Sequence, residues 1–144
     1  MSRIRPFVPA ILWMAVIFTF SSSLFGNEGS GALFEPLLRL VYPGASREFV
    51  ELLHFLFRKA AHFTEYAVLA VLWHRGLAGV PGLDARRAVM TALAVSAAYA
   101  ASDEFHQSFV PGRTPSALDV LLDSAGAAAA CLALWLRRGK ARPA

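Results

Sequence analysis

The chain has 144 residues, of which 56% are hydrophobic and 17% are charged, and its mean hydropathy of +0.49 lies far above that of soluble proteins. This composition excludes a soluble globular protein and predicts an integral membrane protein with a single domain, residues 1–144. The net charge of +4 also suits a nucleic-acid partner. However, the basic residues gather at the ends of apolar runs, where topology and anionic headgroups place them. We therefore exclude nucleic acid and expect membrane lipids as partners.

The first apolar run covers residues 7–25. At about 1.5 Å per residue it is long enough to cross a hydrocarbon core of about 30 Å. A cleavable signal peptide is the competing interpretation, because basic residues precede the run and small residues follow it. The apolar runs further along the chain favour a first transmembrane helix.

Residues 26–57 lose this long apolar run and mix apolar with charged residues. Four of the apolar residues fall on one helical face: Leu33, Leu37, Leu40 and Val41. This spacing predicts a short amphipathic helix on the membrane surface. The Pro–Gly pair at 43–44 ends that helix, and a second one is expected to begin near Ser46.

The second predicted span covers residues 58–77. Lys59, His62 and Tyr66 stack along one of its faces, and Glu65 follows His62 by three residues. A polar face in an apolar span must point into the bundle. Glycine and proline between residues 76 and 83 predict a turn after this span.

The third predicted span covers residues 87–109, because no helix breaker precedes Pro111. Its alanine and serine content allows neighbouring backbones to approach closely. The fourth covers residues 115–137, with Thr114 as the expected cap and Pro115 at the first helical position.

Small residues line one face of the fourth span. Gly126 and Ala130 lie four residues apart, on the same face as Asp119 and Asp123, which predicts tight packing against another helix. Cys131 lies within an apolar run, and we expect it to be a small core side chain rather than a disulfide partner.

Lysine and arginine residues predict the orientation. The amino terminus carries two, the turn between spans two and three carries three, and the carboxyl-terminal tail carries four. Short cytoplasmic segments carry an excess of these residues, so all three segments should lie in the cytoplasm. We therefore predict an all-α, multi-pass protein of the plasma membrane with four transmembrane helices, both termini cytoplasmic, and the amphipathic segment between spans one and two.

This topology places polar residues of three spans near the outer face. The start of span two, the end of span three and the start of span four meet there. They carry Lys59, His62, Glu65, Asp103, Glu104, Gln107, Arg113, Asp119 and Asp123. A single Asp or Lys at the centre of a membrane costs about 2.5 to 3.5 kcal/mol. So many at one depth predict a shared, partly hydrated pocket.

Two motifs run through these residues: Lys59-x-x-His62-x-x-Glu65-Tyr66, and Asp103-Glu104-x-x-Gln107-x-Phe109-x-Pro111-Gly112-Arg113-x-x-Ser116-x-x-Asp119-x-x-x-Asp123-x-x-Gly126. Together with Phe20-Ser21-Ser22 they closely resemble the VanZ-like membrane proteins, over about residues 11–134. The resemblance implies a small polytopic membrane protein linked to resistance to the glycopeptide teicoplanin. It implies no particular reaction.

The first functional hypothesis is a site that binds or processes a lipid-linked envelope precursor. His62 is a candidate general base, and Arg113 can bind phosphate or carboxylate with two hydrogen bonds. The candidate catalytic residues are His62, Glu65, Asp103, Glu104 and Asp119. The candidate substrate-binding residues are Lys59, Tyr66, Gln107, Arg113, Ser116 and Asp123. Because the carboxylates outnumber Lys59 and Arg113, protons, a divalent cation or a cationic ligand would balance the site.

The second hypothesis is a non-enzymatic membrane component, or a small transporter coupled to protons or ions. Lys59 and Arg113 would then neutralise the carboxylates, while His62 and Gln107 complete the hydrogen bonds that hold the helices together. The two hypotheses leave enzymatic activity, a bound metal and the oligomeric state open.

Overall fold

The computed structural model describes residues 4–22, 27–111 and 115–140, and for 27–30 and 139–140 the backbone alone. The described residues form helices and no strands, so the all-α prediction is confirmed. In chain order the elements are the 3-10 turn η1 (Arg5–Phe7) and the helices α1 (Val8–Ser21), α2 (Asn27–Val41), α3 (Arg47–Leu77), α4 (Ala85–Gln107) and α5 (Ala117–Lys140).

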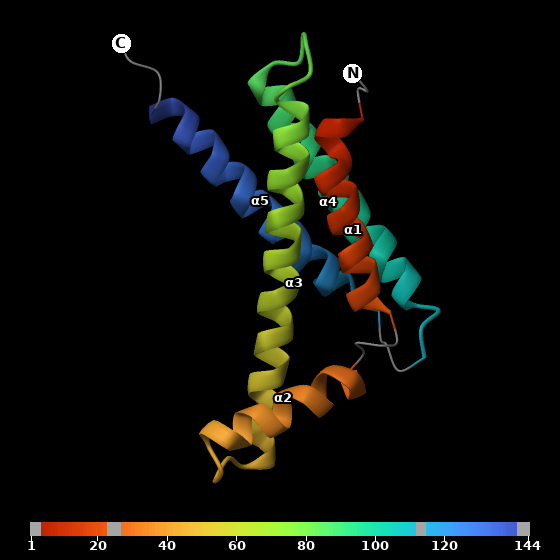
Figure 1. The fold of residues 1–144 in the computed structure, drawn as a ribbon, viewed down its shortest axis with the longest axis vertical. Coiled ribbons are helices and arrows are strands. Elements are labelled where there is room, and N and C mark those ends of the chain that lie inside the picture. Colours follow the sequence, from red (N-terminus) through yellow and green to blue (C-terminus); the bar gives the residue numbers. More distant parts are fainter. Residues whose placement is uncertain (1–3, 23–26, 112–114, 141–144) are drawn as a thin grey trace.

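The long helix α3 is the centre of the fold, because it contacts each of the other helices. The start of α1, the α3–α4 turn and the end of α5 lie at one end of the molecule (Figure 1). At the other end α2 crosses the beginning of α3, and the α4–α5 connection lies toward that side (Figure 1). We call these two parts the termini half and the α2 half.

Helix α1 is shorter than the sequence predicts. It ends at Ser21, and Ser22 has an extended backbone with ψ of 171°. Its 14 residues span about 21 Å, less than the hydrocarbon core of about 30 Å. The prediction of a helix through residues 7–25 is therefore wrong at Ser22, which is not helical. Residues 23–25 lie outside the described part of the chain.

Helix α2 confirms the predicted helix between the first two spans. Its apolar face is not covered by protein: Leu33, Leu37, Leu40 and Val41 are 64%, 66%, 81% and 84% exposed. An apolar face left open in this way suits an element that lies against lipid.

Helix α3 begins where the sequence predicts, because the Ser46 hydroxyl accepts a hydrogen bond from the Phe49 amide at 3.3 Å. It then continues unbroken through residues 58–77, so the predicted second span is the later part of one helix. The ring of His54 packs on Phe34 of α2, with 5.2 Å between centroids. Burial, and then the charge of Arg58, lower the pKa of His54, which favours the neutral imidazole at this contact.

The α3–α4 turn begins later than predicted. Gly76 is buried inside α3, where a Cβ atom would lie 2.6 Å from the ring of Phe7. A glycine is needed there because η1 packs directly on this turn of helix. In the turn itself Gly82 has a φ of +79°, and Asp84 caps α4 by accepting from the Arg87 amide at 2.8 Å.

Helix α5 begins differently from the prediction. Pro115 precedes the helix, which starts at Ala117, and the Ser116 hydroxyl accepts from the Leu118 amide at 3.2 Å. Ser116 is therefore the cap, and the predicted cap Thr114 lies outside the described residues. The predicted tight packing is confirmed, because a Cβ atom on Gly126 would lie 2.1 Å from the backbone oxygen of Phe63 on α3.

Two groups of buried apolar residues form the core. The first gathers small residues of three helices: Ala70, Val89, Ala92, Ala127 and Cys131. The second lies nearer α1 and contains Ile17, Tyr66, Leu69 and Ala100. Cys131 is 3% exposed, so its predicted place in the core is confirmed.

Within the described residues, one segment is both long and apolar enough to cross a membrane, Ala117–Arg138, and Arg5–Ser21 is a shorter apolar helix. Charged residues interrupt the apolar character of α3 and α4. The four-span topology therefore stays a prediction.

Candidate functional site

A group of polar side chains lies where α4 ends and α5 begins, against α3 and the end of α1. We call it the polar cluster. Its members are Ser21, Lys59, His62, Tyr66, Asp103, Glu104, Gln107, Ser116, Asp119 and Asp123. The structure thus brings together candidate residues that lie up to 64 positions apart in the chain, from Lys59 to Asp123.

The outer part of the polar cluster is an ion pair between α3 and α5. The ammonium group of Lys59 contacts Oδ1 of Asp119. Their side chains are 30% and 22% exposed, so this pair is reachable from outside the helices. The Lys59 nitrogen also lies 5.3 Å from the centre of the Phe55 ring, a distance at which a cation and an aromatic face attract each other.

A second pair of titratable residues lies deeper. His62 Nδ1 and Asp123 Oδ2 are 3.6 Å apart, which is too long for a hydrogen bond. The Asp123 side chain is 1% exposed, and neither of its oxygens has a hydrogen-bond partner among the described residues. A buried carboxylate without partners is costly, so this position favours a proton, a water molecule or a polar ligand group.

Asp103 connects α4 to the end of α1. Its Oδ2 atom accepts hydrogen bonds from the Ser21 hydroxyl at 2.6 Å and from the Gln107 amide at 3.0 Å, and all three side chains are buried. These bonds hold the last residue of α1 against α4. Ser21 was not among the candidate site residues predicted from the sequence, although it belongs to the Phe20-Ser21-Ser22 segment that carries the family resemblance.

Glu104 lies beside the start of α5, where its Oε2 atom accepts a hydrogen bond from the Ser116 amide at 2.9 Å. The carboxyl groups of Asp119, Asp123 and Asp103 lie nearby. Glu104 therefore both holds the first turn of α5 and adds a further carboxyl group to the polar cluster. Its contact with Ser116 gives it a structural role that the sequence prediction did not include.

Tyr66 is the largest fully buried side chain of the polar cluster. It is fully buried, its hydroxyl has no hydrogen-bond partner among the described residues, and its ring lies 6.3 Å from that of Tyr99. Tyr99 donates a hydrogen bond to the Met14 carbonyl at 2.7 Å, and Trp13 donates to the Glu65 carbonyl at 2.9 Å. Tyr99 and Trp13 thus hold α1 against α4 and α3, a role that sequence reasoning missed because both look like ordinary apolar-face aromatics.

Two candidate residues remain. Glu65 is partly buried on α3 and interacts electrostatically with His62, as the spacing of three residues predicts. Arg113 lies outside the described residues. Among the side chains that the structure describes, no three or more His, Cys, Asp and Glu are arranged to hold a metal ion.

The fold and the polar cluster define a small helical protein with a buried ionic site built from α1, α3, α4 and α5. A family model described as VanZ/LLP1 matches residues 7–138, which is most of the chain. The chain therefore belongs to the VanZ/LLP1 family. No curated protein and no solved structure matches it. The family assignment and the apolar helix α5 together indicate a membrane protein.

Proposed function

We propose that the polar cluster binds the headgroup of a lipid-linked cell-envelope precursor at the outer face of the plasma membrane. The link to teicoplanin resistance follows from the family resemblance, and it supports an envelope component that a glycopeptide affects as the substrate. In this proposal α3, α4 and α5 cross the membrane, the apolar segment Arg5–Ser21 (η1 and α1) forms a first, shorter span, and both termini are cytoplasmic.

The observation that carries the proposal is the gradient of exposure through the polar cluster. Lys59 and Asp119 are partly exposed, whereas Asp123 behind them is 1% exposed and has two carboxylate oxygens without hydrogen-bond partners. A site with partly exposed residues at its rim, and with buried oxygens that lack hydrogen-bond partners at its base, suits a polar ligand that enters from one side.

The chemistry of the polar cluster suits a headgroup with groups of both charges. Lys59 and protonated His62 can donate to phosphate or carboxylate oxygens, whereas Asp119 and Asp123 accept from ammonium and hydroxyl groups. His62 lies next to Asp123, an arrangement in which a carboxylate can orient an imidazole as a general base. The site would thus allow either binding alone or proton transfer to a bound headgroup.

The arrangement of the helices supports the orientation. The start of α1, the α3–α4 turn and the end of α5 share the termini half (Figure 1), and these are the segments that carry the excess lysine and arginine. The polar cluster lies toward the opposite end, where α4 meets α5. If the positively charged segments are cytoplasmic, the polar cluster lies in the outer half of the membrane.

The test compares His62→Gln, Asp119→Asn and Asp123→Asn with wild type and with the exposed control Glu35→Gln. Membrane-inserted yield and the teicoplanin sensitivity of expressing cells are measured together, and binding of a purified lipid-linked precursor is measured in detergent. We expect near-normal yield, at least tenfold weaker binding and loss of the effect on sensitivity, because hydrogen bonds to charged groups contribute about 1.5 to 3 kcal/mol each. Collapse of the yield in all three variants would instead assign the cluster a structural role.

A second function is favoured by one specific observation. Asp123 is buried, has no hydrogen-bond partner among the described residues and faces His62 at 3.6 Å, as in groups that take up and release protons or small cations. If the protein is a proton- or ion-coupled transporter, proteoliposomes that contain it should take up protons or cations when a gradient is applied. Asp123→Asn should abolish this flux of protons or cations. Precursor binding without any flux would reject this alternative.

A further inference from the structure

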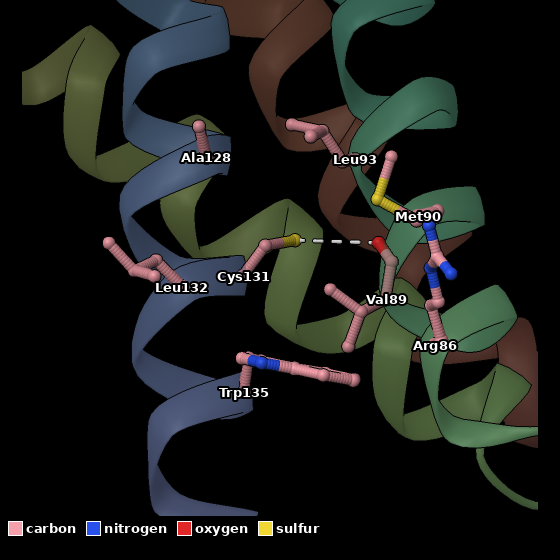
Figure 2. Close-up of a pocket in the computed structure, with 8 residues that line it drawn as sticks. All are labelled: Arg86, Val89, Met90, Leu93, Ala128, Cys131, Leu132 and Trp135. Atoms are coloured by element: carbon pink, nitrogen blue, oxygen red, sulfur yellow. Dashed lines mark hydrogen bonds between the residues drawn. The ribbon is translucent and has the colours of Figure 1, made fainter.

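The termini half contains a groove of about 280 Å³ between α4 and α5 (Figure 2). None of its lining residues belongs to the polar cluster. Val89, Met90 and Leu93 line its α4 side, and Ala128 and Cys131 lie on its α5 side. The groove exists because the alanine and the cysteine leave space that larger side chains would fill. The Cys131 thiol points across it toward the Val89 carbonyl, with 3.7 Å between sulfur and oxygen.

The two ends of the groove differ. Trp135 lies at the end nearer the carboxyl terminus of α5, whereas Leu93 and Ala128 lie at the end toward the middle of the bundle (Figure 2). The Arg86 side chain extends from the start of α4 along that helix to beside Met90 (Figure 2). The groove thus has an aromatic side chain at its outer end, a basic group along its α4 edge and an apolar inner end. Tryptophan and arginine favour this position at the level of the lipid headgroups, with apolar surface directed to the acyl chains.

Arg86 is the charged residue that lines the groove. It is exposed on the first turn of α4, and it makes no hydrogen bond or ion pair within the part of the chain that the structure describes. Its neighbour Arg87, in contrast, pairs with Asp84 at 3.3 Å. An unpaired guanidinium at the edge of an apolar groove is complementary to a phosphate attached to an acyl chain.

We infer that the groove binds one acyl chain of an anionic phospholipid of the cytoplasmic leaflet, with the lipid phosphate on Arg86. The volume decides how much of the lipid enters, because it lies just below the range of about 300 to 1,000 Å³ typical of small-molecule sites. It holds part of one chain, and the rest of the lipid stays in the bilayer. This inference depends on cytoplasmic termini but not on the function proposed for the polar cluster.

The experiment uses the full-length protein in mixed micelles that contain equal amounts of phosphatidylglycerol and phosphatidylcholine, with retained lipid counted by native mass spectrometry. We expect wild type to retain one phosphatidylglycerol in preference to phosphatidylcholine. Arg86→Gln should lower that preference about fivefold, because a basic residue at an anionic surface contributes about that factor. Ala128→Phe should remove the retained lipid, because its ring fills the groove.

Two matched controls come from neighbouring residues. Arg87→Gln removes the same charge outside the groove, and Ala129→Phe adds the same bulk at an exposed position of α5 that does not line it. Both should retain lipid as wild type does. If Ala128→Phe lowers the melting temperature, Ala128→Leu takes its place, and Arg86→Gln tests the charge independently.

Three results would overturn the inference. One is equal retention of the two lipids by wild type, and another is an unchanged preference in Arg86→Gln. The third is a dimer that Ala128→Phe dissociates while lipid retention stays normal, which would make the groove a contact between two copies of the chain.

Discussion

The two halves of the α4–α5 pair differ in the side chains that they bury. In the α2 half, Asp103, Glu104 and Asp123 are buried between the helices. In the termini half, the same two helices meet through alanine, valine and cysteine, and a groove remains open between them. The buried carboxyl groups of Asp103 and Glu104 accept hydrogen bonds from Ser21 of α1, Gln107 of α4 and the Ser116 amide before α5. Asp123 instead faces His62 of α3 at 3.6 Å.

The comparison also shows where each half is incomplete. In the polar cluster, the Asp123 oxygens and the Tyr66 hydroxyl have no hydrogen-bond partners among the described residues, so further polar groups are needed to pair with them. The groove lacks apolar atoms, because small side chains leave about 280 Å³ unfilled. We expect a polar headgroup to complete the first and an acyl chain to complete the second.

The largest expected effect comes from the residue that sets the α3–α5 distance for both halves. Gly126→Leu would place a side chain into the Phe63 backbone, where a Cβ atom alone would lie 2.1 Å from the oxygen. We expect a loss of about 3 kcal/mol in the free energy of unfolding, at the upper end of the cost of overpacking. Thermal unfolding in detergent measures it.

The control for this prediction is Ala125→Leu, which adds a larger side chain at the adjacent, exposed position. It should unfold at the wild-type temperature. Equal stability of the Gly126 variant and wild type would mean that α3 and α5 do not pack through this glycine.

A somewhat smaller effect is expected at Asp103. Asp103→Ala removes the acceptor of the Ser21 and Gln107 hydrogen bonds and should cost about 2 to 3 kcal/mol in the free energy of unfolding. Asp103→Asn keeps one carbonyl oxygen and should lose less. If the two substitutions cost the same, the hydrogen bonds to Oδ2 would not be what holds α1 against α4.

At the rim of the polar cluster, stability and function should separate. Lys59→Met should cost about 1 kcal/mol, because the Lys59–Asp119 pair is partly exposed. Exchanging the two residues, Lys59→Asp with Asp119→Lys, should restore stability but not precursor binding, because the charges then face the ligand in the wrong order. Recovery of binding in the exchanged protein would argue that the pair is structural only.

The smallest effect is expected for the exposed pair Arg47–Glu51, whose side chains are 89% and 65% exposed. Glu51→Gln should change the free energy of unfolding by less than about 0.5 kcal/mol and leave teicoplanin sensitivity unaltered. A larger loss, measured by the same thermal unfolding, would show that the start of α3 packs against a partner in the membrane.

Much of the helical pattern followed from local chemistry. The helix start near Ser46 and the inward face of Lys59, His62 and Tyr66 depend on spacing alone, and the structure confirms them. The run before Pro111 is also helical, but α4 covers Ala85–Gln107 and ends two residues before the predicted limit of 109. The end of α1 could not be predicted in this way. It depends on the contact of Ser21 with Asp103, 82 residues away, which no local pattern contains.

The start of α5 was missed for a similar reason. Thr114-Pro115 is a good local start signal, but the first turn is fixed by Ser116, whose amide binds Glu104 across the connection. In the candidate site, spacing indicated which side chains share a face but not which pairs form. The pairing of Lys59 with Asp119 and of His62 with Asp123 depends on the axial register of α3 against α5, which the spacing within one helix does not determine.

The most direct test of the central claim, that the two halves face opposite sides of the membrane, is thiol labelling in intact cells. With Cys131 replaced by serine, a single cysteine is placed at exposed Ser108, after α4, or at exposed Ala78, in the α3–α4 turn. We predict that a membrane-impermeant maleimide labels Ser108→Cys in intact cells, and Ala78→Cys only after the membrane is disrupted. Labelling of both positions from outside, or of Ala78→Cys alone, would contradict the proposed topology and with it the outer-face site.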